Sequence, residues 1–372
     1  MNTHQEIHLN TTKIEELESI RGLAAFLVIF FHMPKWNPIL DIGFINNGYL
    51  MVELFFVLSG FVIFNAYAEK IATKKDLFRF QLLRFGRLYP VHLLFLFVFL
   101  GIEITKYIAS TRLGINSPNS IPFQTNNFSA FVKNIFLISS VLPTQPHTYN
   151  SPAWSISVEF YTYLVFAVSI LFIKKSTTFF FTALSFISLL MLTTENTFGF
   201  ESILSCFAGF FIGCITAKFT KDIKKNIPSF YSVIVFFVIA SFLQFKTTKE
   251  FDHLIYFLTA ALIVSLVLSK NGALKTILRL NFLTWLGTIS YSVYMSHAAI
   301  EWIANQVIRV LLKKPEIIGI DGISIPQLSE LETLLACVVV ALVVLIVSGA
   351  LYKFIEKPMR EKSRQFAFSK LN

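Results

Sequence analysis

The sequence predicts an all-α, polytopic membrane protein, a transmembrane helical bundle of about ten spans. Of its 372 residues, 55% are hydrophobic and 42 are phenylalanine, more apolar material than a soluble domain of this size can bury. The apolar residues form blocks of about 17–25, the length that crosses a bilayer. The net charge of +10 is typical of cytoplasmic loops in membrane proteins, so a nucleic-acid partner is not expected.

The apolar blocks define a single membrane domain over residues 1–372. Lysine and arginine concentrate in alternate loops, so the positive-inside rule predicts that both termini are cytoplasmic. Polar tails are expected at 1–16 and 353–372, an outer loop at about 109–152, and a further re-entrant or interfacial piece at 131–142. The expected spans are about 18–33, 46–68, 88–108, 153–173, 177–194, 198–217, 229–245, 253–269, 282–308 and 332–352.

Two ionisable side chains, Arg21 and His32, lie within the first apolar block, where such groups are rare and mark functional sites. On a helix they fall within roughly 20° of each other and about 16 Å apart along the axis. One face of the first span therefore carries a permanent cation near its inner end and a proton-transfer group toward its outer end. We expect both residues in the functional site.

The second and third spans carry further polar residues. Glu53 lies just within the outer boundary of the second span, and Ser59-Gly60 either permits close helix packing or contacts a ligand. Arg84 and Arg87 project from one helix face at the inner boundary of the third span. Such a pair can bind phosphates through forked hydrogen bonds, with anionic lipid headgroups as the alternative partner.

The fourth span begins with a polar stretch that includes Trp154, Ser155 and Glu159. Ser155 and Glu159 share one helix face, one turn apart. A carboxylate at this depth in a membrane needs a partner, and Arg21 or His32 would supply it.

The ninth span contains Tyr291, Tyr294 and His297, followed by Glu301. Tyr294 and His297 are three residues apart, and His297 and Glu301 four, so all three share one face. The run has too many hydroxyl groups for a lipid-facing surface and is expected to line a polar cavity. A histidine satisfied within the core is the alternative interpretation of His297.

Six of these segments, taken in order, resemble the motifs of the acyltransferase-3 family of membrane-bound acyltransferases. Glu18 and Glu53 stand where that family usually has aspartate. Some members carry an additional esterase-like domain with a Gly-Asp-Ser motif, which is not found here, so we expect a member with the membrane domain only. The matching segments are Leu17-Glu-Ser-Ile-Arg-Gly-Leu-Ala-Ala25 with His32, Val52-Glu-Leu-Phe-Phe-Val-Leu-Ser-Gly-Phe61, Arg84-Phe-Gly-Arg87, Ala153-Trp-Ser-Ile-Ser-Val-Glu-Phe-Tyr161, Ile289-Ser-Tyr-Ser-Val-Tyr-Met-Ser-His297 and Phe354-Ile-Glu-Lys-Pro358.

The resemblance implies transfer of an acyl group, usually acetyl, from acyl-CoA to a hydroxyl group. Expected acceptors are surface polysaccharides such as lipopolysaccharide O-antigen, capsule or exopolysaccharide, with a small molecule or a lipid-linked sugar as alternatives. The implied location is the bacterial inner membrane, with the lipid bilayer as surroundings and no metal. A proton-coupled transporter or flippase also fits ten spans with buried charges, although no inverted repeat is visible.

These expectations suggest a role for each candidate residue. His32 would act as the general base toward the acceptor hydroxyl, or attack the thioester itself, with Glu159 orienting its imidazole. Arg84 and Arg87 would bind the phosphates of acetyl-CoA, and Arg21 would help at the inner mouth. The residues expected to line the substrate site are Glu53, Trp154, Ser155, Tyr291, Tyr294 and His297.

Overall fold

The computed structural model describes residues 14–143, 147–319 and 322–369 and is built from helices, with one short hairpin in which β1 (Glu316–Ile318) pairs antiparallel with β2 (Ser324–Pro326). Parts of the expected tails and of the expected outer loop fall outside these residues. The helices are α1 (Glu15–His32), α2 (Gly43–Asn46), α3 (Met51–Tyr67), α4 (Lys74–Leu113), α5 (Phe128–Ile135), α6 (Ala153–Ile173), α7 (Thr177–Thr193), α8 (Glu201–Asp222), α9 (Phe230–Phe245), α10 (Leu254–Leu268), α11 (Ala273–Leu278), α12 (Asn281–Leu311), α13 (Glu330–Leu351) and α14 (Lys357–Ser369).

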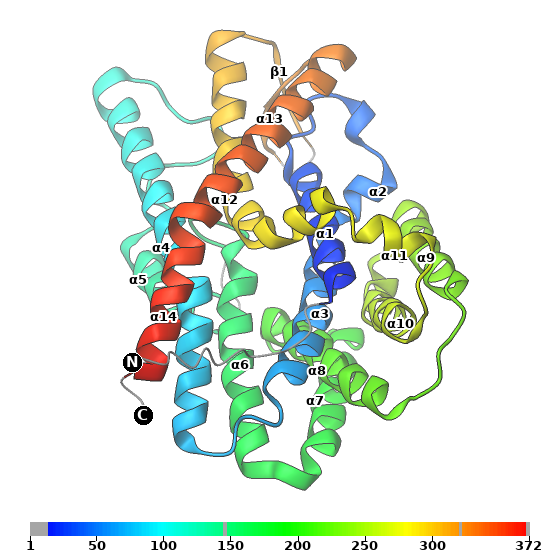
Figure 1. The fold of residues 1–372 in the computed structure, drawn as a ribbon. Helices are drawn as coiled ribbons and strands as arrows, with labels where there is room; N and C mark the ends of the chain where they lie inside the picture. The colour runs from blue at the N-terminus through cyan, green and yellow to red at the C-terminus, as the bar shows by residue number, and fades with distance from the viewer. Residues whose placement is uncertain (1–13, 144–146, 320–321, 370–372) are drawn as a thin grey trace, which may run out of the picture.

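The helices form a bundle (Figure 1), and its exterior is strongly apolar. Within the described residues, six helical stretches are long and apolar enough to cross a membrane. α13 shows the pattern most clearly, because Leu331, Val338, Leu342 and Ile346 are all more than half exposed along one side, where lipid would cover them. Each expected span overlaps a helix, whereas the number of spans and the cytoplasmic location of the termini remain predictions.

α4 is much longer than the span expected at 88–108. It begins after a capping box, in which the Thr73 hydroxyl accepts from the backbone of Asp76 and the Asp76 carboxylate accepts from the backbone of Thr73, satisfying two terminal donors. It ends only at Gly114, whose φ of 67° suits a glycine cap. The connection that follows α4 therefore starts later than the expected position 109. The C-terminal residues also differ from a plain tail, because α14 packs along α4 (Figure 1).

α1 and α12 lie side by side in the centre of the bundle and run parallel (Figure 1). Two glycines allow the close approach, because a Cβ on Gly22 would lie 2.6 Å from the backbone nitrogen of Gly287, and one on Gly287 would lie 2.1 Å from the carbonyl oxygen of Glu18. His32 and His297 follow these glycines by the same number of residues. Parallel packing in this register therefore brings the two histidines together.

α3 packs against α8 with similar closeness at Gly60 and Gly213. A Cβ on Gly60 would lie 1.8 Å from the carbonyl oxygen of Phe210, and one on Gly213 would lie 2.1 Å from that of Val57. Of the two interpretations of Ser59-Gly60, Gly60 therefore serves helix packing. Small residues at such a crossing are the usual means by which membrane helices associate.

We expect Gly60→Ala to lower the free energy of unfolding by about 3 kcal/mol, because a methyl group facing a backbone oxygen forces the two helices apart. Thermal melting of the detergent-solubilised protein measures the effect. Gly101→Ala is the matched control, since nothing lies within 4 Å of its Cβ position. Equal melting temperatures for the two variants would contradict this account of the packing.

Candidate active site

His32 is the last residue of α1, and its ring lies beside that of His297 from α12, with the ring centroids 4.8 Å apart. The Nδ1 atom of His32 donates to the carbonyl oxygen of Val28 at 3.1 Å. A carbonyl oxygen can only accept, so Nδ1 carries the proton and Nε2 of the neutral ring keeps its lone pair. Within the described residues Nε2 has no hydrogen-bond partner, which leaves it available as a base or a nucleophile.

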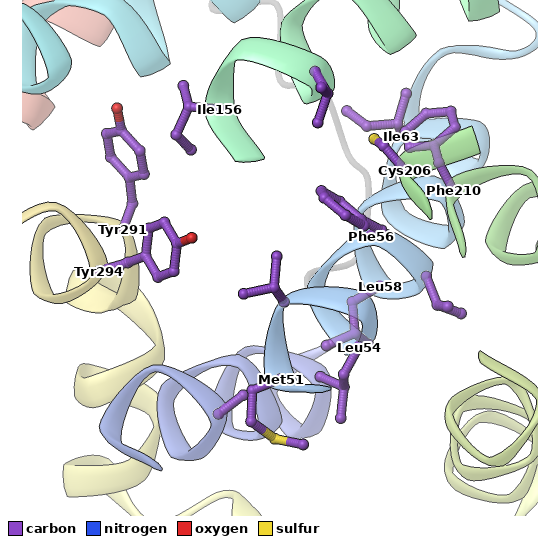
Figure 2. Packing of buried hydrophobic residues seen from close by; sticks show 14 of the residues in the cluster. Met51, Leu54, Phe56, Leu58, Ile63, Ile156, Cys206, Phe210, Tyr291 and Tyr294 are labelled. Atoms are coloured by element: carbon purple, nitrogen blue, oxygen red, sulfur yellow. The ribbon is translucent and has the colours of Figure 1, made fainter. Parts of the chain in front are cut away.

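A set of polar contacts leads from the two histidines into the bundle. The rings of His297 and Tyr294 have centroids 5.8 Å apart, and the Tyr294 hydroxyl accepts from Ser155 at 2.9 Å while donating to the carbonyl oxygen of Pro152 at 2.9 Å. Figure 2 shows Tyr291 and Tyr294 projecting from α12 toward the helices that carry Phe56 and Ile156. The hydroxyl groups of the ninth expected span thus face protein, as predicted for a polar interior surface.

A small cavity of about 50 Å³ lies at this point and brings several of the expected site residues together. Arg21 lines it from α1, and Glu159 from α6 lines the same space. The side chains that complete the lining are Val52, Phe55, Phe56, Ser155, Ile156, Ser290, Tyr291 and Tyr294. Arg21 and Glu159 therefore share a cavity, which was one of the two pairings expected for this carboxylate.

The Glu159 carboxylate is held by two hydroxyl groups and does not hydrogen-bond to His32. Its Oε1 atom accepts from Ser59 at 2.6 Å and from Tyr163 at 2.5 Å. Tyr163 was not among the predicted site residues, although it lies four residues after Glu159 and therefore on the same helix face. The structure thus places Glu159 in a hydroxyl network between α3 and α6.

The two arginines of α4 have different surroundings. Arg84 is buried, donates to the Tyr67 hydroxyl at 3.0 Å, and its guanidinium lies 5.7 Å from the centroid of the Phe80 ring and 5.9 Å from that of Tyr163. Such an arrangement is stabilised by cation–π attraction. Arg87 lies instead among acidic groups, and the charges that act on it include Glu18, Glu159 and Glu356.

Glu356 had no role in the sequence-based predictions beyond its place in the closing motif. It ends the π-helical turn η5 (Tyr352–Glu356), is buried, and accepts from the Ser292 hydroxyl at 2.8 Å. The charges of Arg87 and Arg21 both act on it. A π-turn frequently marks a functional position in a helix, and here it holds a buried carboxylate on which the charges of Arg87, Arg360 and Arg21 act.

Glu53 and Trp154 line a second, larger cavity of about 720 Å³. Oε1 of Glu53 accepts from Ser205 at 3.3 Å, whereas its Oε2 is enclosed and has no hydrogen-bond partner. Trp154 packs edge-on against Phe56, with ring centroids 6.0 Å apart. Because Trp154 lines the large cavity and the adjacent Ser155 lines the small one, the two spaces are neighbours.

Comparison with known families explains this set of residues. The model of an acyltransferase domain, Acyl_transf_3, matches residues 14–353. The chain belongs to the acyltransferase-3 family. The matched region contains five of the six motifs noted in the sequence and every residue of both cavities, and the closing motif at Phe354 begins directly after it. Together with the long apolar helices, membership identifies a multi-pass membrane protein with an acyltransferase domain.

Three curated proteins are similar to this acyltransferase-3 chain. "Putative peptidoglycan O-acetyltransferase YrhL" of Bacillus subtilis is 24% identical over 93% of this chain and 55% of its own length. "Acyltransferase MdmB" of Streptomyces mycarofaciens is 28% identical over 44% and 41%, and "Protein 2 in picA locus" of Rhizobium radiobacter is 35% identical over 27% and 50%. The chain spans about half the length of the curated relatives it matches. No solved structure matches it.

Proposed function

We propose that this protein is an O-acyltransferase that moves an acyl group, most simply acetyl, from acyl-CoA to a hydroxyl group of a cell-surface glycan. One observation carries the proposal, namely that His32 has a fixed tautomer and a free Nε2 atom within an acyltransferase domain. A base of this kind is what the transfer requires, because a neutral hydroxyl group is a poor nucleophile until its proton is removed.

The acceptor class is supported by the relatives. The similarity that covers most of this chain is to a protein named as a putative peptidoglycan O-acetyltransferase, which favours a cell-wall glycan over lipopolysaccharide or capsule. The enzyme would then act at the plasma membrane, with the glycan hydroxyl reaching the end of α1 that carries His32. This orientation agrees with the excess of lysine and arginine in the opposite set of loops.

The donor would bind at the other end of the site. Arg87 and Arg21 supply positive charge near the small cavity, among the carboxylates of Glu159 and Glu356. Phosphate groups bind well to arginine because the guanidinium makes paired, charge-assisted hydrogen bonds. The cavity of about 50 Å³ is far smaller than a pantetheine arm, so we infer that donor binding widens the path toward His32.

The reaction then needs two proton transfers, one from the acceptor hydroxyl to His32 and one from His32 to the CoA thiolate. Nε2 of His32 takes the proton of the acceptor hydroxyl while its oxygen attacks the thioester carbon. The C–S bond breaks, the new ester forms, and the CoA thiolate takes the proton back from the imidazolium. If His32 attacked the thioester instead, an acyl-histidine would precede the ester, and trapping labelled protein in the absence of acceptor distinguishes the two routes.

Analysis of surface glycans from the source cell tests the proposed function. We expect base-labile O-acyl groups to disappear from a cell-wall glycan when the gene is deleted and to return with the wild-type gene. Mass spectrometry and proton NMR identify both the ester and the sugar that carries it. Unchanged esters on every surface glycan would contradict the proposed acceptor class.

A further inference from the structure

The large cavity lies at the end of the bundle where α1 stops and where α3, α6, α8 and α10 begin. Its volume of about 720 Å³ is in the range of small-molecule binding sites. It is formed by segments that are far apart in the sequence and that meet only in the folded protein. The lining residues are Glu53, His147, Trp154, Leu192, Thr193, Glu195, Thr197, Glu201, Ser202, Ser205, Thr248, Lys249, Glu250, Asp252, His253 and Tyr256.

The lining is strongly acidic, although the chain as a whole has a net charge of +10. Five carboxylates face the cavity and Lys249 is the one ammonium group in its lining. Asp252 is neutralised by Lys246 at 2.6 Å. Within the described residues the other four carboxylates, Glu53, Glu195, Glu201 and Glu250, form no ion pair. Glu195, Glu201 and Glu250 are exposed, so the cavity keeps a net negative charge beyond what Lys249 offsets.

Glu53 gives the clearest sign that the cavity binds a ligand. Its Oε2 atom is enclosed by protein and accepts no hydrogen bond. An enclosed polar atom without a partner is costly, and such atoms are rare in proteins. Because Glu53 also lines the cavity, a small rotation of its side chain would present Oε2 to a ligand that donates a hydrogen bond, above all a charged N–H donor, and would remove that cost.

Aromatic rings form part of the wall. Trp154 has the ring of His147 beside it, with centroids 5.6 Å apart, and Tyr256 stacks with His253 at 6.2 Å. Tyr256 is also fixed by a hydrogen bond of 2.9 Å with Ser205. Flat rings beside carboxylates suit a ligand with a polar, cationic edge and an apolar face, because cations are attracted to aromatic faces.

Short contacts connect the cavity to His32. The Tyr49 hydroxyl donates to both oxygens of Asp252, at 2.9 and 2.8 Å. The Tyr49 ring lies 5.7 Å from that of Phe31, which in turn lies 4.8 Å from that of His32. Tyr49 and Phe31 therefore form a continuous series of contacts from the acidic wall to the proposed base, which does not itself line the cavity.

We propose that this cavity is the acceptor site and that it takes a saccharide carrying a free, positively charged amino group. That the bound saccharide is the acyl acceptor rests on the proposed function, but the preference for a positive charge follows from the lining alone. The ammonium group contacts Glu53 and Glu201, the sugar face lies against Trp154 or Tyr256, and a neighbouring hydroxyl group is directed toward His32. Saccharides with uronic acid groups are repelled by the unpaired carboxylates of the lining.

Binding of three trisaccharides to the purified protein tests the preference. The probes are glucosamine trisaccharide with free amines, its fully N-acetylated and therefore neutral form, and galacturonic acid trisaccharide. Isothermal titration should show the aminated probe binding about tenfold or more tightly than the neutral one, and no binding of the acidic one. Higher salt should weaken the aminated probe selectively, because charge attraction is screened.

Two variants locate the effect. Glu53→Gln and Glu201→Gln keep the shape of each side chain, so the aminated probe should lose about tenfold in affinity while the neutral probe is unchanged. Glu69→Gln is the control, since that carboxylate is 84% exposed and pairs with Lys221 outside the cavity. Equal binding of the aminated and neutral probes, no binding of any probe, or variants without effect would each overturn the assignment.

The same proteins separate this inference from the proposed function. CoA release from acetyl-CoA reports acyl transfer, whereas titration reports the cavity without any reaction. Selective binding without CoA release would leave the cavity assignment standing and contradict the acyltransferase proposal. CoA release that depends on a neutral or acidic saccharide, with no preference for the aminated one, would support the acyltransferase proposal and contradict the cavity assignment.

Discussion

Replacing His32 by alanine should reduce acyl transfer by about 100- to 10,000-fold, the range found for removal of a general base. Nδ1 of this ring is already committed to the carbonyl oxygen of Val28, so Nε2 is the atom available for the reaction. The variant removes that atom. Release of CoA from acetyl-CoA by the purified protein, with a glycan acceptor, measures the loss.

The effect should be chemical and not structural. His32 is at the end of α1 and only partly exposed, so His32→Ala should retain most of its melting temperature and should still bind acetyl-CoA. His32→Gln provides a second variant of similar size. Activity within about threefold of the wild-type rate in either variant would remove the histidine from the mechanism, since even modest general-base catalysis exceeds that factor.

Replacing the two arginines of α4 by alanine should have different effects, one on donor binding and the other on stability. Arg87→Ala should raise the Michaelis constant for acetyl-CoA by about 10- to 100-fold, the value of one or two charge-assisted hydrogen bonds. Arg84→Ala should instead lower the free energy of unfolding by about 2 kcal/mol, because it loses its hydrogen bond to Tyr67 and its contacts with aromatic rings.

Steady-state kinetics and thermal melting, done on both variants, separate the two outcomes. Arg84→Lys keeps the charge but not the forked geometry, so it should recover little of the stability. A large donor defect in Arg84→Ala with an unchanged melting temperature would show that Arg84 also binds the donor directly. An unchanged Michaelis constant for acetyl-CoA in Arg87→Ala would contradict the donor site proposed here.

The positions of the helices could be predicted because a membrane span is encoded by the length of an apolar block. Where capping residues decide a boundary, the prediction was less accurate, as at the start of α4, whose capping box at Thr73 and Asp76 lies outside the apolar block. The hairpin of β1 and β2 and the helix α14 were also missed, because neither element depends on burial in lipid.

The site was predicted only in part, because a sequence gives the face of a helix but not the helix that the face meets. Arg21 and Glu159 were expected near each other, and both line the small cavity. The proximity of His32 and His297 depends on the parallel packing of α1 and α12 through two glycines, which no motif encodes. The partners of Glu159, Ser59 and Tyr163, depend on the rotation of α3 relative to α6.

The acidic cavity illustrates the same limit. Glu201 and Glu250 lie at or shortly before the N-terminal ends of α8 and α10, where acidic residues are common and need no special explanation, and Glu195 lies in the connection between α7 and α8. Only their convergence with Glu53 and Trp154 around one space indicates a binding site. Among these five residues, the sequence motifs contain Glu53 and Trp154 alone.

Acetyl transfer across a sealed membrane tests the central claim most directly. The purified protein is reconstituted into vesicles that contain glucosamine trisaccharide, and labelled acetyl-CoA is added outside. We expect base-labile label on the enclosed saccharide, carried by molecules whose Arg87 end faces outward, and none with His32→Ala. If acetyl-CoA is neither bound nor consumed, or if label forms only when donor and acceptor share one compartment, a donor site and an acceptor site at opposite ends of the bundle are excluded.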